Sequence, residues 1–429
     1  MFSKETQFQE TDIGRIPQEW QVTTLSNVAE IRGNRRISNF KQIAFIPMAL
    51  VPDSHLFAKY EMREKEQVKS YTYCEAGDLL LAKITPSLEN GKQGIVPSDI
   101  SEGVALATTE VFPIRSKGID TLFLFYVLKF SKFRNKIISS MIGTTGRQRA
   151  SKEGVERLKV PLPPSYEQRG IVEVLSCVDL AIQKTDEVIA KTERLKKGLM
   201  QKLLTEGIGQ KEFKETGIGK TPRHWEITKI KSIALDKKGA IKIGPFGSQL
   251  KKNELAPEGI KVYGQENVMK NDFALGNRYL TVEKFQTLKG FELYPKDVLI
   301  TMMGSIGYST PFPDNVERGI MDSHLIRIQI DKSRILPSFL SRLVNDYGSI
   351  RKQIQSMSQG AIMSGLNSQI VKNIRIPLPS IEEQQKIVDV LSIADKRLEV
   401  ERKQKAKLKR IKQGLMDLLL SGKVRVRVD

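Results

Sequence analysis

The chain has few of the residues that enzymes most often use for chemistry. It contains two cysteines and three histidines among 429 residues. Cys74 and Cys177 lie in non-equivalent places, and no metal-ligand spacing occurs, so zinc or nucleophilic chemistry is not expected. No apolar run reaches the roughly 18 residues of a membrane span. The N-terminal stretch has no apolar segment, and with so few cysteines this predicts a reduced, cytoplasmic setting.

Catalytic and nucleotide-binding motifs are also missing. Gly219-Lys220-Thr221 resembles the end of a phosphate-binding loop, but the first glycine of that motif falls on Lys214. We find no glycine-rich dinucleotide fingerprint, no convincing nuclease arrangement of carboxylates and no Asn-Pro-Pro-Tyr type pocket for methyl transfer. We therefore expect a chain that binds other molecules and catalyses nothing itself.

Positive charge, in contrast, is abundant. The 69 lysines and arginines outnumber the 49 acidic residues and give a net charge of +20. Most of this excess lies outside the two long helical segments described below. Such a balance indicates a polyanionic partner, most often nucleic acid. The alternative is that the charge serves solubility alone and that the chain is a protein scaffold.

The sequence repeats itself. Residues 10–29 read ETDIGRIPQEWQVTTLSNVA, and residues 215–234 read ETGIGKTPRHWEITKIKSIA. Residues 160–204 open with VPLPPSYEQRGIVEVLS, and residues 376–420 open with IPLPSIEEQQKIVDVLS. Within this second pair, Pro161 and Pro377 lie 216 positions apart, as do Leu199 and Leu415. The chain is a tandem duplication of roughly 210 residues, which predicts a two-site function.

Two variable parts, near residues 20–155 and 225–370, accompany the repeated segments. Apolar runs and helical patterns alternate in both, so each is predicted to be a mixed α+β domain. Helical patterns run from Leu122 to Ile138 and from Ser338 to Met357. A faint common plan is visible, because Gly77-Asp78-Leu79-Leu80 resembles Lys296-Asp297-Val298-Leu299.

Each Pro-Leu-Pro segment leads into one predicted long helix of about 38 residues, or roughly 57 Å. The two helices would bury their apolar stripes as an antiparallel coiled-coil pair, which relates the units by a pseudo-two-fold axis. Basic domains held apart by such a spacer suit a bipartite target on double-stranded DNA. The stripe residues are Ile171, Leu175, Val178, Ile182 and Leu199 in the first helix, and Ile387, Leu391, Leu398 and Leu415 in the second.

Three stretches combine glycine with Lys, Arg, Asn or Gln, which suits contact with phosphates and base edges. They are Ala82–Lys92, Gly143–Arg149 and Ile243–Lys252. Arg147 and Arg149 are the strongest candidates, because arginine can fork onto guanine O6 and N7. Exposed turns without a binding role are the alternative. The candidate DNA-binding residues are Lys83, Lys92, Arg147, Gln148, Arg149, Lys242, Ser248, Gln249, Lys251 and Lys252.

This order of segments resembles the specificity subunit of Type I restriction–modification systems. The likeness rests on the paired motifs Pro161-Leu162-Pro163 with Glu167-Gln168 and Pro377-Leu378-Pro379 with Glu383-Gln384, and on the Gly-x-x-Pro-x-x-Trp restart. It implies a target-recognition domain at 1–158, a helical spacer at 159–207, a second target-recognition domain at 208–374, and a second spacer with a tail at 375–429. Each domain would read one half of an asymmetric DNA target.

The resemblance also implies partners. The helices would dock two modification subunits, which bind S-adenosylmethionine and methylate adenine, and a restriction motor-nuclease subunit would join them. S-adenosylmethionine, ATP and magnesium are thus expected on the partners, and no cofactor on this chain. A specificity subunit of a Type IIB-like enzyme shares these features and remains an alternative, as does a stand-alone nuclease. The sequence does not spell out the target bases.

Overall fold

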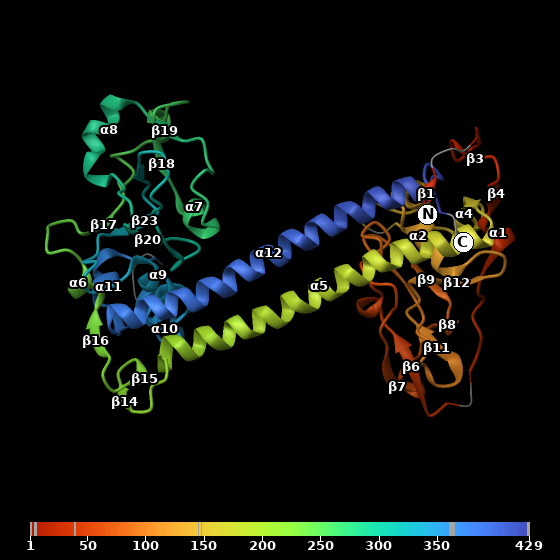
Figure 1. The fold of residues 1–429 in the computed structure, drawn as a ribbon, viewed down its shortest axis with the longest axis horizontal. Coiled ribbons are helices and arrows are strands. Elements are labelled where there is room, and N and C mark those ends of the chain that lie inside the picture. The colour runs from red at the N-terminus through yellow and green to blue at the C-terminus, as the bar shows by residue number, and fades with distance from the viewer. Residues whose placement is uncertain are drawn as a thin grey trace. The chain divides into compact units, whose positions relative to one another are not determined.

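The computed structural model describes residues 2–3, 7–37, 40–144, 146, 148–359 and 365–426. Its residues group into two compact units, Met1–Ile189 with Glu401–Asp429, and Ala190–Val400. Both units mix strands and helices, and both contain part of each long helix, α5 (Ser165–Glu206) and α12 (Ile381–Leu419) (Figure 1). The mixed α+β prediction is confirmed. In the described ranges, no helix combines the length and apolar character needed to cross a membrane.

The first domain, within the first unit, is built on two four-stranded sheets. One has the strand order β10-β9-β12-β5 and is antiparallel throughout, and the other has the order β7-β6-β11-β8. The apolar run at 104–114 contributes one strand to each sheet, with a turn at residues 108–110 between them. The bounds are β5 (Ala29–Ile31), β6 (Gln42–Ile46), β7 (Glu61–Glu64), β8 (Thr72–Glu75), β9 (Leu79–Ala82), β10 (Gln93–Ile95), β11 (Val104–Ala107) and β12 (Val111–Ser116).

The helices of the first domain are short. The prediction of one helix from Leu122 to Ile138 is wrong, because Phe130 has an extended backbone (φ −68°, ψ 127°) and separates two helices. The Phe130 side chain is buried against Phe133, with 6.0 Å between ring centroids, so tertiary packing sets this break. The helices are α1 (Leu25–Val28), α2 (Thr121–Lys129), α3 (Ser131–Ser139) and α4 (Lys152–Glu156).

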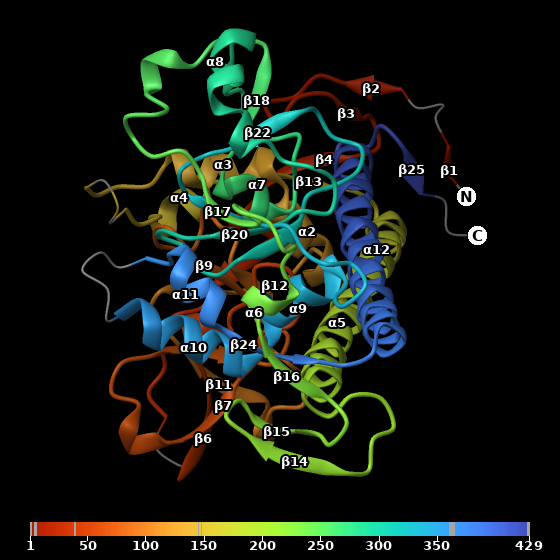
Figure 2. The same ribbon diagram turned by 90° about the vertical axis from the view of Figure 1, so that its left-hand side faces the viewer.

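The second domain, within the second unit, has a four-stranded sheet of order β17-β23-β20-β21 and a three-stranded sheet of order β19-β18-β22. Strands of both sheets, among them β17, β20, β18 and β22, are seen in Figure 2. Its strands are β17 (Ile241–Ile243), β18 (Ile260–Tyr263), β19 (Tyr279–Leu280), β20 (Val298–Thr301), β21 (Ser309–Pro311), β22 (Gly319–Met321) and β23 (Leu325–Ile328). Its helices are α6 (Ile230–Ile233), α7 (Gln265–Lys270), α8 (Val282–Leu288), α9 (Pro337–Asp346), α10 (Gly348–Gln359) and α11 (Ser368–Asn373).

The second predicted helix, from Ser338 to Met357, is broken in the same manner as the first. Tyr347 has an extended backbone (φ −83°, ψ 111°) between α9 and α10 and is buried. An aromatic residue within an apolar pattern is compatible with a continuous helix, so local periodicity did not reveal either break.

The faint common plan of the two domains is confirmed at one turn. The Glu75 N–H donates to Asp78 Oδ2 at 2.7 Å, just before β9, and the Tyr294 N–H donates to Asp297 Oδ2 at 3.0 Å, just before β20. The residue before each aspartate has a positive φ, 83° at Gly77 and 74° at Lys296. A left-handed backbone costs a non-glycine residue about 1–2 kcal/mol, so the rest of the second domain must stabilise this turn at Lys296.

In each unit, a strand from the restart segment pairs with a strand from the Pro-Leu-Pro segment. The strand β4 (Gln21–Thr24) runs antiparallel to β13 (Lys159–Leu162), and β16 (Glu226–Lys229) runs antiparallel to β24 (Arg375–Leu378). The restart segments also form the β2 (Phe8–Gln9) to β3 (Ile16–Pro17) and β14 (Phe213–Thr216) to β15 (Gly219–Pro222) hairpins. Near the chain ends, β1 (Phe2–Ser3) pairs with β25 (Arg425–Val426).

Candidate nucleic-acid interface

The two repeated motifs meet in each unit through one tryptophan and one glutamate. Trp20 Nε1 donates to Glu167 Oε2 at 2.8 Å, and Trp225 Nε1 donates to Glu383 Oε2 at 3.0 Å. Both indole rings are buried, so each tryptophan anchors its restart motif to the start of a long helix. The restart motif and the long-helix motif of each repeat are therefore two sides of one contact.

The glutamine that follows each glutamate fixes the next helix. Gln168 Oε1 accepts from the N–H of Asp120 at 2.8 Å, and Gln384 Oε1 accepts from the N–H of Leu336 at 2.9 Å. These are the residues that precede α2 and α9. Each glutamine also donates through Nε2 to the last proline carbonyl of its own Pro-Leu-Pro motif. The Glu-Gln pair thus sets where each domain sits on its stretch of long helix.

The long helices run antiparallel within each unit. In the first unit, Lys412 Nζ lies 2.5 Å from Asp179 Oδ1, and Lys405 pairs with Asp186. In the second unit, Lys196 pairs with Asp395. From one ion pair to the next, the residue number in α5 rises while that in α12 falls. The helices are therefore antiparallel, as the sequence predicts.

The nine stripe residues lie inside their own units. Six are buried and three are half-buried, so in this structure they pack the helices on each other and on the domains. Exposed apolar side chains of the same helices include Leu195 and Ile393. The buried residues are Ile171, Leu175, Ile182, Ile387, Leu391 and Leu398, and the half-buried ones are Val178, Leu199 and Leu415.

Two of the glycine-rich stretches of the first domain come together where β9 ends. Ile84 forms a β-bridge with Arg149, the Thr85 N–H donates to the Gln148 carbonyl at 3.1 Å, and the Ala150 N–H donates to the Lys83 carbonyl at 2.8 Å. The structure therefore brings together three predicted residues, Lys83, Gln148 and Arg149. Arg147, predicted with them, lies outside the described residues.

The basic side chains of these two stretches differ in the contacts that they make within the domain. Arg149 Nη2 lies 3.1 Å from both carboxylate oxygens of Glu110. Lys83 Nζ lies 4.9 Å from the centroid of the Phe112 ring, and burial, with Arg149 nearby, lowers the pKa of its ammonium. Lys92 points inward and donates to the carbonyls of Met48 at 2.8 Å and Val51 at 2.9 Å. Lys92 thus holds a loop in this structure.

The third stretch forms the loop after β17 in the second domain. Gly244 is required there, because a Cβ at this position would lie 1.8 Å from the Asp322 carbonyl oxygen. Lys242 is turned inward, 3.1 Å from the Gly290 carbonyl and 4.0 Å from the Phe291 ring centroid. Burial lowers the pKa of its ammonium. Four predicted residues are exposed on the loop: Ser248, Gln249, Lys251 and Lys252.

Comparison with known proteins accounts for this duplicated plan. Residues 17–194 and 222–410 both match the family described as the type I restriction modification DNA specificity domain. The chain belongs to this specificity family. It is 28% identical to the putative type I restriction enzyme MjaX specificity subunit of Methanocaldococcus jannaschii, over 99% of this chain and 98% of that protein. The MjaVIII specificity subunit of the same organism is 26% identical, with the same coverage of both chains.

Solved structures share the fold. The type I restriction–modification S subunit from M. genitalium has a TM-score of 0.53 at 14% identity, over 93% of this chain and 96% of that one. A chain from a structure concerned with assembly and conformational transition of the type I R-M system has a TM-score of 0.56 at 16% identity. It covers 95% of this chain and 99% of its own length.

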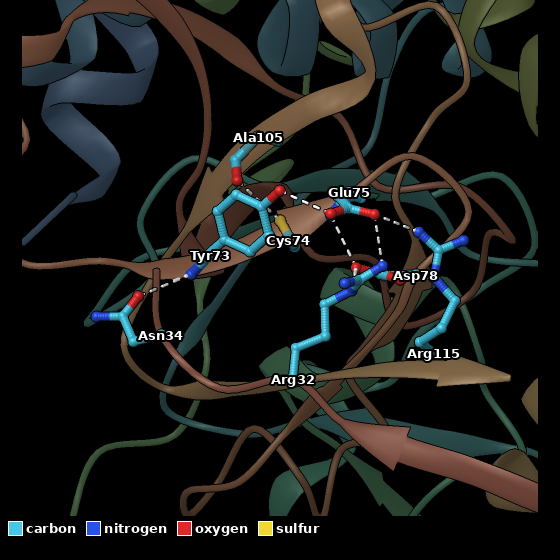
Figure 3. A network of polar contacts seen from close by, with 8 residues as sticks. All are labelled: Arg32, Asn34, Tyr73, Cys74, Glu75, Asp78, Ala105 and Arg115. Atoms are coloured by element: carbon cyan, nitrogen blue, oxygen red, sulfur yellow. Dashed lines mark hydrogen bonds and ion pairs between the residues drawn. The ribbon is translucent and has the colours of Figure 1, made fainter. Parts of the chain in front are cut away.

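This member of the specificity family also contains an ion-pair network that sequence reasoning missed (Figure 3). Arg32 binds Asp78 through Nε and Glu75 through Nη2, both at 2.6 Å. Arg115 binds the same two carboxylates, each at 2.8 Å. Asp78 is fully buried, and Tyr73 Oη donates to Glu75 at 2.7 Å. Each arginine lies 37 to 46 residues from the carboxylates that it binds, so no local motif reveals these ion pairs.

The second domain of this specificity-family chain has a sparser counterpart of the network. Tyr294 Oη donates to Glu292 at 2.9 Å, and Arg318 Nε binds the same carboxylate at 2.5 Å. Asp297 has Arg327 Nε at 3.9 Å. Among the side chains that the structure describes, no group of three or more His, Cys, Asp or Glu is placed to hold a metal ion.

Proposed function

We propose that this chain is the DNA-recognition subunit of a type I restriction–modification complex and is itself non-catalytic. Each domain would read one half of a bipartite, asymmetric target in double-stranded DNA. The long helices would dock two modification subunits, which carry S-adenosylmethionine, and a restriction subunit would supply the ATP- and magnesium-dependent motor and nuclease.

One observation carries this proposal. The two domains share a sheet plan and identical attachment contacts to the long helices, yet their exposed loops differ. The first presents exposed Arg149 beside half-buried Lys83 and Gln148, and the second presents exposed Ser248, Gln249, Lys251 and Lys252. A repeated frame with different polar and basic loops suits two readers of different sequences. The named relatives are of type I, which favours this assignment over a Type IIB-like enzyme.

The test is co-expression of the full chain with its modification subunit in a host that lacks other DNA methylation, followed by single-molecule sequencing of the genome. We expect methylated adenine at a split target with two different halves. Cells with the modification subunit alone are the control and should show no such pattern. Methylation at one continuous site, or none, would contradict the proposal. Magnesium-dependent cleavage by the purified chain would instead support a stand-alone nuclease.

A further inference from the structure

The segment after β5 occupies the same place in the first domain as the exposed loop after β17 in the second. In the first domain, Ile114 of β12 lies opposite both Ile31 of β5 and Leu79 of β9. In the second, Ile328 of β23 lies opposite both Ile241 of β17 and Val298 of β20. Leu79 and Val298 follow the matching aspartates, so β5 and β17 are equivalent strands.

This equivalence gives the residues after β5 a counterpart among the DNA-binding candidates. Because β5 runs parallel to β9 across β12, both strands lead out of the sheet in the same direction. The loop after β17 leaves its sheet beside β20 in the same way. Residues 32–37 of the first domain, with sequence RGNRRI, therefore correspond to the loop that carries Lys251 and Lys252.

The ion-pair network fixes the start of this segment (Figure 3). Arg32 is bound to Asp78 and Glu75, so its own guanidinium is not available to a ligand. Asn34 Oδ1 accepts from the Tyr73 N–H at 3.2 Å, and the next carbonyl, that of Arg35, accepts from Tyr71 Oη at 3.4 Å. The segment is thus held through two side chains, those of Arg32 and Asn34, and through the backbone carbonyl of Arg35, which reduces the entropy lost when it binds a partner.

Two exposed arginines, Arg35 and Arg36, lie at the end of this fixed stretch. The Arg35 guanidinium lies 5.7 Å from the centroid of the Tyr73 ring, and Arg36 is the next residue in the sequence. Neither forms an ion pair with a carboxylate of the described residues. Arg149, by contrast, is occupied by Glu110. Arg35 and Arg36 are therefore better placed than Arg149 to bind an external acceptor.

We propose that Arg35 and Arg36 form a DNA-contacting element of the first domain, an inference that rests on the proposed function. A guanidinium presents paired N–H donors that match two acceptors side by side, as on a phosphate or on guanine O6 and N7. The element binds such an acceptor of the duplex. The Arg32 network orients the element and does not touch the DNA.

The experiment uses the full chain assembled with its modification subunit. Selection from a randomised duplex library supplies the target, and fluorescence anisotropy gives the affinity for target and unrelated duplexes at several salt concentrations. The variants are Arg35→Ala, Arg36→Ala and Arg36→Lys. Arg15→Ala is the matched control, because Arg15 is also exposed and lies 4.8 Å from the ring centroid of Phe8.

We expect Arg36→Ala to weaken target binding about tenfold or more, as loss of a good bidentate contact does, and Arg15→Ala to have no effect. If the acceptor is phosphate, both duplexes lose affinity equally, the slope of log affinity against log salt falls by about 0.9, and Arg36→Lys restores much of the binding. If it is guanine, only the target loses affinity, one G·C position becomes tolerant, and Arg36→Lys does not restore discrimination.

Wild-type affinity in both arginine-to-alanine variants would overturn the proposal. The double variant Lys251→Ala with Lys252→Ala separates this failure from failure of the proposed function. If that variant loses affinity while the Arg35 and Arg36 variants do not, the chain recognises DNA without this element. If the wild-type assembly itself shows no salt-dependent DNA binding, the proposed function and this inference fail together.

Discussion

Trp225 donates its indole N–H to Glu383 at 3.0 Å, across 158 residues of chain. The carboxylate also accepts from the Ile208 N–H at 3.0 Å and from Gln210 at 3.1 Å. One half-buried carboxylate thus joins three parts of the second unit: the restart motif, the segment that follows α5 and the start of α12. The same bond between Trp20 and Glu167 organises the first unit.

Removal of the indole donor should destabilise the unit that contains it. Trp225→Phe keeps one aromatic ring but loses the N–H and part of the buried volume. We expect the free energy of unfolding to fall by at least about 1.5–3 kcal/mol, the contribution of a hydrogen bond to a charged group. Hydrogen exchange resolved by peptide would show the loss in residues 190–400. Trp20→Phe is the matched variant and should affect the other unit. Equal protection in both units would contradict this assignment.

The stability of the second unit should also depend on pH through Glu383. Burial opposes ionisation, but the backbone, Trp225, His224 and Gln210 donors outweigh it and hold the pKa of Glu383 below its usual range. The unfolded chain therefore binds this proton more readily than the folded one. The stabilisation is present above the ordinary glutamate pKa and is lost as pH falls through the lowered value.

Glu383→Gln tests this pH dependence. The variant should be less stable than the wild type at neutral pH, and the difference should shrink as the pH falls into the acid range. Urea unfolding between neutral and acid pH measures it. A difference that stays constant with pH would show that ionisation of Glu383 does not contribute.

Two predicted DNA-binding lysines should behave differently on substitution. Lys251 is exposed, so Lys251→Ala should weaken binding to all duplexes and, if it meets a phosphate, lower the salt slope by about 0.9. Lys92 is bound to two carbonyl oxygens within its domain, so Lys92→Ala should lower thermal stability and leave the salt slope unchanged. Titrations at several salt concentrations, with melting curves, separate the two. A lowered slope for Lys92→Ala would place its ammonium on DNA.

Arg425→Ala should destabilise the first unit. Arg425 binds Glu167 through Nε at 2.6 Å and Nη2 at 2.8 Å, and Glu167 is fully buried. Its loss removes two donors from a buried carboxylate, and breaking a buried pair in this way costs about 3–5 kcal/mol. Arg223→Ala is the control, because Arg223 and Glu212 form an exposed pair worth about 0–1 kcal/mol. Chemical unfolding of both variants measures the contrast.

Periodic and repeated features of the fold were predictable from sequence. The long helices follow from apolar spacings of three and four, and the duplicated frame follows from two matching segments, because both signals are local. The contacts that attach each domain to the long helices join residues far apart in the sequence. No pattern near Gln168 indicates that its amide fixes Asp120, 48 residues away.

The candidate site was predictable only in part, for the same reason. Composition marks Lys92 and Lys242 as cations but does not reveal that carbonyl oxygens of distant segments occupy their ammonium groups. Arg35 and Arg36 escaped notice although Gly33 and Asn34 give their segment a composition like that of the other loops, because its equivalence to the loop after β17 appears only in strand pairing. The DNA-binding roles of the predicted residues stay predictions.

The make-up of the two units has a consequence for how the protein is produced. The second unit is one uninterrupted stretch, Ala190–Val400, whereas the first also needs Glu401–Asp429. Met416, Leu419 and Val426 belong to its core, and β25 supplies the partner of β1. During synthesis, the second unit has all its residues before the first does. Residues 1–189 are therefore made before the second unit but keep an incomplete core until residues 401–429 are made.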